Sequence, residues 1–286
     1  MVQGQAASWV YEHLRRGIGQ QVHSTCEATA GMKEQASETQ SGRYVYCVTD
    51  RAYPKNLRVA GIEGRPVYGI ECKGISAVVH RCSLEPYESK DAGQIRKWVV
   101  AHHRVARKCW MELGSAVPAA FDTIIKGGDQ EVQKWLKDDY DRLTEKLRRL
   151  HGKAEYGVQI SWNPEIIGRR LIEKESRIKE LQLRQRRSRQ GMAYILAKKI
   201  EQELAGELRK KGEQYLHDFY SKIAGTVDAM HMDPVKKVQT GQMLMNLSVL
   251  VTNGKQHLLG KILAEVKGME GFRVRFTGPW PPYSFA

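Results

Sequence analysis

The stretch GFRVRFTGPWPPYSF, residues 271–285, closes the sequence and decides how the half of the chain before it folds. Phe272, Val274 and Phe276 alternate with two arginines, a period of two that is typical of a strand with one buried and one solvent-exposed face. The prolines that follow cannot donate a hydrogen bond to a sheet, so we expect the strand to end at Thr277. The sequence therefore predicts a final strand followed by a stiff, extended, aromatic tail.

The aromatic residues of this tail carry more apolar area than a free chain end can leave in water. They are Trp280, Tyr283 and Phe285. Burying one such side chain is worth roughly 1.5–3 kcal/mol. The favoured interpretation is a clasp that docks on the chain's own domain. In the alternative, these three aromatics are candidate partner-binding residues. A Pro-x-x-Pro ligand at Pro279–Pro282 is a weaker third interpretation, because such matches are common by chance.

The size and charge of the chain permit two domains and favour acidic partners. Its 286 residues are enough for two domains of about 100–200 residues each. With 41% hydrophobic residues, each domain can form a core. The net charge of +14 fits nucleic acid, an anionic membrane or an acidic protein surface, and does not choose among them.

The cysteines and the hydropathy pattern predict a cytoplasmic protein. Five scattered cysteines, none in a Cys-x-x-Cys pair, indicate reduced thiols rather than a zinc site or a disulfide framework. No apolar run approaches the roughly 20 residues of a membrane span. The N-terminus lacks the apolar core of a secretory signal.

The first half of the chain is predicted to contain a polar extension and an α/β domain. Residues 1–42 are rich in Gln, Ser, Thr and Gly, and we expect a disordered or weakly ordered extension. The N-terminal α/β domain is expected over residues 43–152. Within it the pattern predicts strands at 43–49 and 75–80, a helix from about 91 to 109, an extended segment at 121–124, and a single helix from Asp129 to near Gly152.

The second half, residues 153–286, begins with a strand and a long helical excursion. Tyr156–Trp162 alternates as a strand, and Asn163-Pro164 supplies an N-cap and a first helical proline. Apolar residues then recur at helical spacing along 164–181 and again from Met192 to Ile223. A continuous helix over the latter range would be about 48 Å long. We expect an antiparallel helical hairpin over about 164–225 that projects from the domain.

The remaining elements complete a recognisable order. Strands are expected at 227–232 and 243–251, a helix after Asn253-Gly254, and then the final strand. Four strands and two helical crossings in the order β-α-β-β-α-β are the pattern of a ferredoxin-like domain. The fold class is therefore α+β: an N-terminal α/β domain, and a C-terminal modified ferredoxin-like domain with a long helical hairpin in its first crossover.

The sequence offers no convincing catalytic, cofactor-binding or metal-binding group. It has no Gly-rich phosphate-binding motif and no Gly-x-Ser-x-Gly turn. His102 and His103 point about 100° apart on a helix, and His102 falls on its apolar stripe, so we interpret His102 as a hydrogen-bonded core histidine. We predict no enzyme activity, no cofactor, no metal and no small-molecule substrate.

A basic run lies in the predicted hairpin and could contact a partner. Arg184, Arg186 and Arg187 are the candidate partner-binding residues within it. A solvated helix face or a contact with an acidic protein is favoured. The alternative is an RNA-binding protein with a basic ferredoxin-like domain, but residues 243–251 supply methionines and aliphatics where stacking aromatics would be needed.

Several motifs, in order along the chain, resemble one known family. They are Tyr44-Val45-Tyr46, Gly74–Val79, Trp98-Val99 with Ala101-His102, Pro118 with Phe121, Trp135-Leu136, Gly152-Lys153 with Glu155, Gly191 with Ala193-Tyr194, and Thr277–Phe285. Over about 43–285 the chain resembles the gas vesicle protein F/L family (GvpF/GvpL), and the closing motif is the most specific part of the likeness. Asp122 departs from it, because the family usually has glycine after the phenylalanine.

The resemblance implies a function that composition and periodicity do not reach. It implies a non-enzymatic accessory or minor structural protein of gas vesicle assembly, located in the cytoplasm and at the gas vesicle. The implied partners are the hydrophobic GvpA-like shell protein and other gas vesicle accessory proteins. Nucleic acid is a disfavoured partner, and no membrane association is implied.

Overall fold

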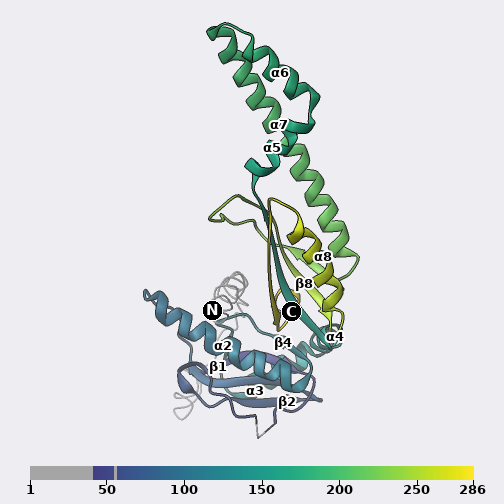
Figure 1. The fold of residues 1–286 in the computed structure, drawn as a ribbon. Helices are drawn as coiled ribbons and strands as arrows, with labels where there is room; N and C mark the ends of the chain where they lie inside the picture. The colour runs from purple at the N-terminus through teal and green to yellow at the C-terminus, as the bar shows by residue number, and fades with distance from the viewer. Residues whose placement is uncertain (1–40, 55–56) are drawn as a thin grey trace. The chain divides into compact units, whose positions relative to one another are not determined.

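The computed structural model describes residues 41–54 and 57–286, which divide into two units (Figure 1). Of these residues, unit 1 comprises those up to Glu155 together with Gly278–Ala286, and unit 2 is Tyr156–Thr277. We call residues 278–286 the C-terminal tail. The sequence-based ranges placed this tail in the second domain, whereas in the structure it belongs to unit 1. The expected N-terminal extension lies outside the described residues, except that Ser41 and Gly42 already belong to a strand.

Unit 1 is built on a five-stranded sheet whose central strand is almost fully buried. The strand order is β2-β3-β1-β4, and β5 also pairs with β1. The strands are β1 (Ser41–Thr49), β2 (Tyr68–Cys72), β3 (Ile75–Ser83), β4 (Ala116–Pro118) and β5 (Ile124–Lys126). In the antiparallel pairing of β1 with β3, Tyr44 lies opposite His80. The predicted strands at 43–49 and 75–80 are thus confirmed.

The long helix of unit 1 begins and ends where its sequence signals indicate. Helix α2 (Ala92–Leu113) follows Asp91, whose Oδ1 accepts the N–H of Gly93 at 2.8 Å as an N-cap. It ends at Gly114, which has φ of 76°, the left-handed conformation that glycine adopts at least cost. The buried face of α2 packs on β1 and carries Val99, His102 and Val105.

Two sequence-based expectations in unit 1 are wrong. The single helix expected from Asp129 is two helices, α3 (Asp129–Asp138) and α4 (Tyr140–Leu150). They are separated by Asp139, whose carboxylate binds Trp135 Nε1 at 3.1 Å and the Arg142 side chain, and a side chain engaged locally in this way favours a helix end. The extended segment expected at 121–124 begins only at Ile124, because Asp122 has φ of 68° and forms a turn.

Unit 2 contains a four-stranded sheet in the order β7-β8-β6-β9. Its strands are β6 (Lys153–Trp162), β7 (Ala229–Met232), β8 (Gln242–Thr252) and β9 (Phe272–Trp280), and helix α8 (Gln256–Gly268) lies between the last two. After β6, Asn163 forms the predicted helix N-cap, because its Oδ1 accepts the N–H of Glu165 at 2.9 Å. The expected sequence of strands and helices is therefore present.

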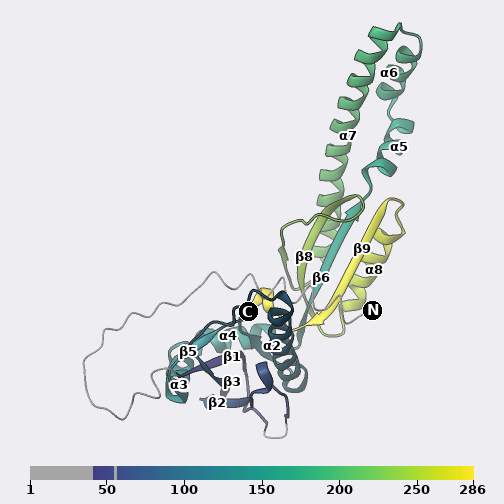
Figure 2. The same cartoon turned by 90° about the vertical axis from the view of Figure 1, so that its left-hand side faces the viewer.

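The helical excursion between β6 and β7 consists of three helices rather than two. They are α5 (Pro164–Lys174), α6 (Ser176–Arg186) and α7 (Gln190–Ala224). The chain between α5 and α6 is extended at Glu175, which divides the stripe that the sequence suggested was continuous. The expected long helix is confirmed as α7, whose 35 residues span about 52 Å. Figure 2 shows α6 lying beside α7 beyond the ends of the strands.

The final strand runs three residues further than expected, to Trp280. Because β9 is an edge strand, a proline in it need not interrupt a hydrogen-bonded ladder, and Pro279 is accommodated within the strand. Phe272 is buried as expected, but Phe276 is 41% exposed and stacks on Tyr156 with ring centroids 5.1 Å apart. The expected buried face of this strand is thus only partly covered.

Candidate partner-binding surfaces

The C-terminal tail docks on unit 1 through its aromatic residues. The hydroxyl of Tyr283 lies 3.2 Å from Nδ1 of His103, and the two rings are 5.9 Å apart. The ring of Trp280 lies 5.6 Å from the ring of His103 in an edge arrangement. Burial raises the pKa of the Tyr283 phenol well above its usual value. The tail therefore covers the surface of α2 at His103.

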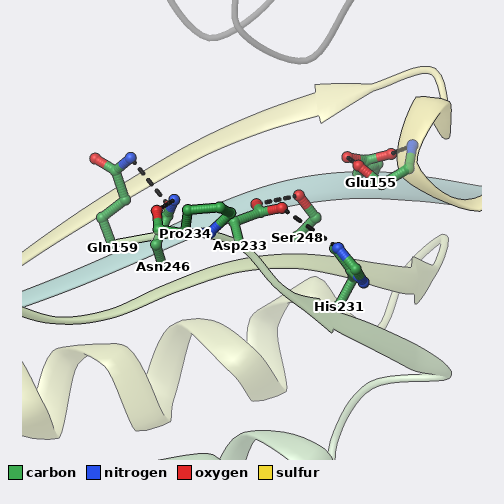
Figure 3. A network of polar contacts seen from close by, with 8 residues as sticks. Glu155, Gln159, His231, Asp233, Pro234, Asn246 and Ser248 are labelled. Carbon is green, nitrogen blue, oxygen red and sulfur yellow. Dashed lines mark hydrogen bonds and ion pairs between the residues drawn. The ribbon is translucent and has the colours of Figure 1, made fainter. Parts of the chain in front are cut away.

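Polar contacts fix the end of the tail to the same unit. Glu155, a fully buried carboxylate, accepts the N–H of Ser284 at 2.8 Å and its hydroxyl at 2.7 Å (Figure 3). The Arg149 guanidinium donates to the carbonyl oxygen of Phe285. Hydrogen bonds to a buried charged acceptor are stronger than neutral ones. The structure thus holds the tail on its own unit, through the rings of Trp280 and Tyr283 and through the carbonyl of Phe285.

Beneath the tail, His102 is held in a fixed, neutral state. Its Nε2 donates to the carbonyl of Ala119 at 3.2 Å, so its Nδ1 is the acceptor of the Tyr44 hydroxyl at 2.8 Å. Tyr44 in turn accepts the N–H of Asp122 at 3.1 Å. Burial lowers the pKa of His102 to about 3. Burial, together with Arg107, lowers the pKa of its neighbour His103 to about 4. The sequence-based interpretation of His102 as a core histidine is confirmed.

A second tyrosine–histidine pair lies in the same core, and sequence reasoning missed it. The N–H of Ile62 donates to the Tyr46 hydroxyl, which lies 2.8 Å from Nδ1 of His80, and Nε2 of His80 lies 3.0 Å from the Tyr87 hydroxyl. Burial lowers the pKa of His80 to about 4 and raises the pKa of Tyr87 to about 12. Tyr44 and Tyr46, two residues apart on β1, could have indicated a shared face, but their partners lie on other elements.

The sheet of unit 2 carries a buried polar network (Figure 3). The hydroxyl of Ser248 donates to Asp233 Oδ2 at 2.9 Å, while Asn246 Nδ2 donates to the carbonyl of Pro234 at 2.9 Å. Gln159 Nε2 extends the network to Asn246 Oδ1 at 3.2 Å. Gln159 on β6 and both Asn246 and Ser248 on β8 are thus engaged in hydrogen bonds within unit 2.

The candidate arginines lie together at the end of α6. Arg184 pairs with Glu180 at 2.6 Å, one turn earlier on the same helix. Arg186 is the last residue of α6, Arg187 is its C-cap, and both are exposed. Within the described residues neither of these two makes an ion pair. The tail aromatics and these arginines belong to different units.

Two further findings bear on the kind of site that the chain can form. Across residues 41–54 and 57–286, no group of three or more His, Cys, Asp or Glu side chains is arranged to hold a metal ion. Among the helices of the same residues, none combines the length and the apolar character needed to cross a membrane.

Comparison with known proteins identifies the family. The family model described as "Gas vesicle synthesis protein GvpL/GvpF" matches residues 42–286. Gas vesicle protein L1 of Halobacterium salinarum is 31% identical over 259 residues, which cover 86% of this chain and 90% of that protein. Gas vesicle protein L of Haloferax mediterranei is 30% identical, covering 79% of this chain and 72% of that protein.

Solved structures show the same fold. The crystal structure of the gas vesicle protein GvpF from Anabaena sp. PCC7120 aligns with a TM-score of 0.63 at 19% identity, covering 86% of this chain and 95% of that chain. GvpF from Microcystis aeruginosa aligns with a TM-score of 0.61 at 16% identity, covering 85% and 98% of the two chains. Because the family model spans both units described above, the chain belongs to the GvpL/GvpF family of gas vesicle synthesis proteins.

Proposed function

We propose that this chain is a non-enzymatic accessory or minor structural protein of gas vesicle assembly that binds the hydrophobic GvpA-like shell protein and other accessory proteins. The observation that carries the proposal is the family match over residues 42–286, which includes both units. The relatives' names, gas vesicle proteins L and F, support a role in the vesicle itself. The basic net charge of +14 supports partners with acidic surfaces.

We infer that unit 2 is a modified ferredoxin-like domain. Numbered from its first strand, its sheet order β7-β8-β6-β9 reads 2-3-1-4, which is the order that a β-α-β-β-α-β chain forms when its two crossings lie on one face. Helices α5–α7 then replace the single helix of the first crossing. This arrangement leaves β7 and β9 as edge strands.

The absence of enzyme activity is part of the proposal and rests on how the buried titratable groups are used. His80 and His102 are each held at both ring nitrogens by a tyrosine and a second group of the core. The buried Asp233 accepts the hydroxyl of Ser248 with Oδ2, and its Oδ1 lies 3.8 Å from Nε2 of the exposed His231, so both carboxylate oxygens are engaged within the fold (Figure 3). A general base needs access to a substrate proton, and these groups are already engaged within the fold.

The edge of β9 is the proposed contact for the shell protein. An edge strand presents unpaired backbone N–H and C=O groups, which pair with another extended chain. Phe276 lies exposed on this strand, and the exposed Arg273 and Arg275 flank it. An apolar, β-rich shell subunit would pair indiscriminately with other copies, and pairing with β9 would keep it from doing so until the wall grows.

A proline scan of Arg273, Val274, Arg275 and Phe276 tests this contact. Successive N–H groups of a strand point to opposite sides, so alternate prolines remove an inward or an outward donor. We expect the two outward prolines to preserve the fold, checked by circular dichroism, and to abolish capture of the shell protein by the tagged full chain. Fold-competent proline variants that capture the shell protein at the wild-type level would contradict the edge contact.

Trp280→Ala tests the tail as a second proposed contact. Because Trp280 already packs on His103, the variant is compared with wild type at a temperature where both are folded. Loss of shell capture by this folded variant would support a partner role for the tail residues Trp280, Tyr283 and Phe285. Unchanged capture would leave the tail with its clasp contacts alone.

A further inference from the structure

The far end of the hairpin is the most one-sidedly charged stretch of the chain. We call residues 183–199 the hairpin tip. The tip contains no aspartate or glutamate, and its basic residues are Arg184, Arg186, Arg187, Arg189, Lys198 and Lys199. Glu180 and Glu201, just outside the tip, pair with Arg184 and Lys198. In the described part of the chain the other four cations make no ion pair, so their charge remains available to a partner.

The same segment exposes an unusual amount of apolar surface. Twelve large hydrophobic side chains are exposed among the described residues, and four of them lie in the tip. These are Leu183, Met192, Tyr194 and Ile195, with 53%, 54%, 67% and 59% of their area exposed. Met192 and Ile195, three residues apart on α7, share one face of that helix, and exposed apolar surface rimmed by polar groups typically marks an interaction site.

These apolar side chains are not needed to hold the hairpin together. Ile178 and Leu181 of α6 are buried and provide its packing face, and α6 packs against α7. Leu183 follows Leu181 by two residues, which turns it about 200° around the helix and directs it away from that face. One set of apolar residues therefore packs α6 against α7, and a second set is exposed to solvent.

On α7 the exposed apolar and basic residues alternate along the same side. Lys198 lies four residues after Tyr194, and Lys199 lies four residues after Ile195, so each pair shares one face of the helix. An ammonium group within an apolar stripe opposes burial in lipid hydrocarbon, because an unpaired charge there is costly. In a protein interface the same ammonium can pair with a carboxylate. RNA would engage the cations but give Leu183, Met192 and Ile195 no role.

We propose that the hairpin tip is a docking site for an acidic, amphipathic helix of another protein. The carboxylates of that helix would pair with Arg186, Arg187 and Lys199, and its apolar face would cover Tyr194 and Ile195. This inference rests on the proposed function in one respect, since the partner would be one of the other proteins of vesicle assembly rather than the β-rich shell subunit at β9.

A synthetic 18-residue helix with leucines on one face and glutamates on the flanks serves as the probe, and a scrambled peptide of the same composition is its control. Binding to the full-length chain is measured by fluorescence anisotropy. We expect the amphipathic peptide to bind with an affinity that falls as salt rises. Arg186→Glu/Arg187→Glu should weaken binding about tenfold or more, because it replaces two ion pairs with the peptide by two repulsive contacts. Tyr194→Ala/Ile195→Ala should weaken it by at least about tenfold through lost apolar burial.

The matched control variant is Lys261→Glu/Lys267→Glu on α8. It makes the same change in net charge at two exposed lysines of the same unit and should bind the peptide within about twofold of wild type. Four outcomes would overturn the proposal. The first is that the amphipathic peptide does not bind, and the second is that the scrambled peptide binds equally well. The third is that the α8 control variant loses as much peptide affinity as the tip variants. The fourth is that phosphatidylglycerol vesicles or polyuridine bind more tightly than the peptide through the same tip residues.

Shell capture, measured in parallel, separates this inference from the proposed function. Tip variants that lose the peptide but still capture the shell protein are the expected result. If the peptide fails to bind while shell capture persists, only the docking site is wrong. If the peptide binds as expected and the shell protein is never captured, the shell contact is wrong and the tip site stands.

Discussion

The C-terminal tail and the hairpin tip both looked suited to partner binding, and their exposure differs sharply. In the tail, Trp280 and Tyr283 pack on His103, and the Ser284 backbone is bonded to Glu155. The tip has Tyr194 at 67% exposure, in a segment whose charged residues are all arginine or lysine. The comparison teaches that an aromatic residue indicates a partner only when the chain's own framework leaves it uncovered.

The largest expected effect is a loss of stability of unit 1, on which the tail docks, as the pH falls. His80, His102 and His103 have pKa values lowered to about 4, 3 and 4. In the unfolded chain each would titrate near 6.5. Stability is therefore complete above about pH 6.5 and falls as the pH drops toward 4, because the unfolded state then binds more protons. Between pH 7.5 and pH 5 the loss is about 2 kcal/mol per histidine.

Urea unfolding at pH 7.5 and pH 5.0 measures this loss. Near-ultraviolet circular dichroism follows the packed aromatics of unit 1, and far-ultraviolet circular dichroism follows the helices. His103→Gln should remove about a third of the pH dependence. An unfolding free energy of unit 1 that stays constant from pH 7.5 to pH 5.0 would contradict the neutral, buried state of these histidines.

A matched pair of tyrosines sharpens the comparison most directly. Tyr283→Ala should cost about 3 kcal/mol, because it removes buried ring area and leaves His103 without its hydroxyl partner. Tyr194→Ala should change stability by less than about 0.5 kcal/mol, as for an exposed residue without structural contacts. Thermal unfolding of the two variants, side by side, gives the difference. Equal losses of stability in the two variants would mean that the tail does not stabilise unit 1, or that Tyr194 has structural contacts.

Tyr44→Phe is expected to have a somewhat smaller effect than Tyr283→Ala. It keeps the ring but removes the hydroxyl that joins the Asp122 N–H to His102 Nδ1, which leaves two groups unpaired and costs about 2 kcal/mol. Tyr220→Phe, at a tyrosine that is 38% exposed on α7, is the control and should be nearly neutral. The unfolding free energy of each variant is read from urea titration. A neutral Tyr44→Phe would show that this hydrogen-bonded chain adds nothing to unit 1.

The smallest expected effect is that of Asp122→Gly. Asp122 adopts φ of 68°, a conformation that glycine reaches without strain, and its Oδ1 accepts the N–H of Tyr87 at 3.0 Å. Relief of strain and loss of this hydrogen bond oppose each other, so we expect a change within about 0.5 kcal/mol. Asp122→Ala loses the hydrogen bond and keeps the strain, and should cost about 1–2 kcal/mol. Equal unfolding free energies for the two variants would argue against the strained turn.

Local patterns predicted much of the fold because the residues that cause it are close together in sequence. The Asn163-Pro164 cap, the length of α7 and the core position of His102 each follow from spacing within one element. The Asp122 anomaly also had a local cause, since a position usually held by glycine proved to have a left-handed backbone. Each of these features depends on residues that are neighbours in the sequence.

The features that were missed depend on distant partners. The extension of β9 to Trp280 is allowed only because β9 lies at a sheet edge, which is a property of the whole sheet. Tyr283 meets His103, which precedes it by 180 residues, and no local pattern indicates that pairing. The helix breaks at Asp139 and Glu175 also escaped notice, because the apolar stripe continues across both.

The grouping of the C-terminal tail with unit 1 has a consequence for how the protein is made. Residues 156–277 are translated after most of unit 1 and before the segment that supplies Trp280 and Tyr283. On the ribosome, a nascent unit 1 therefore has the His103 surface of α2 uncovered until residues 278–286 have been made. During this interval the part of α2 that Trp280 and Tyr283 later cover at His103 is exposed to water.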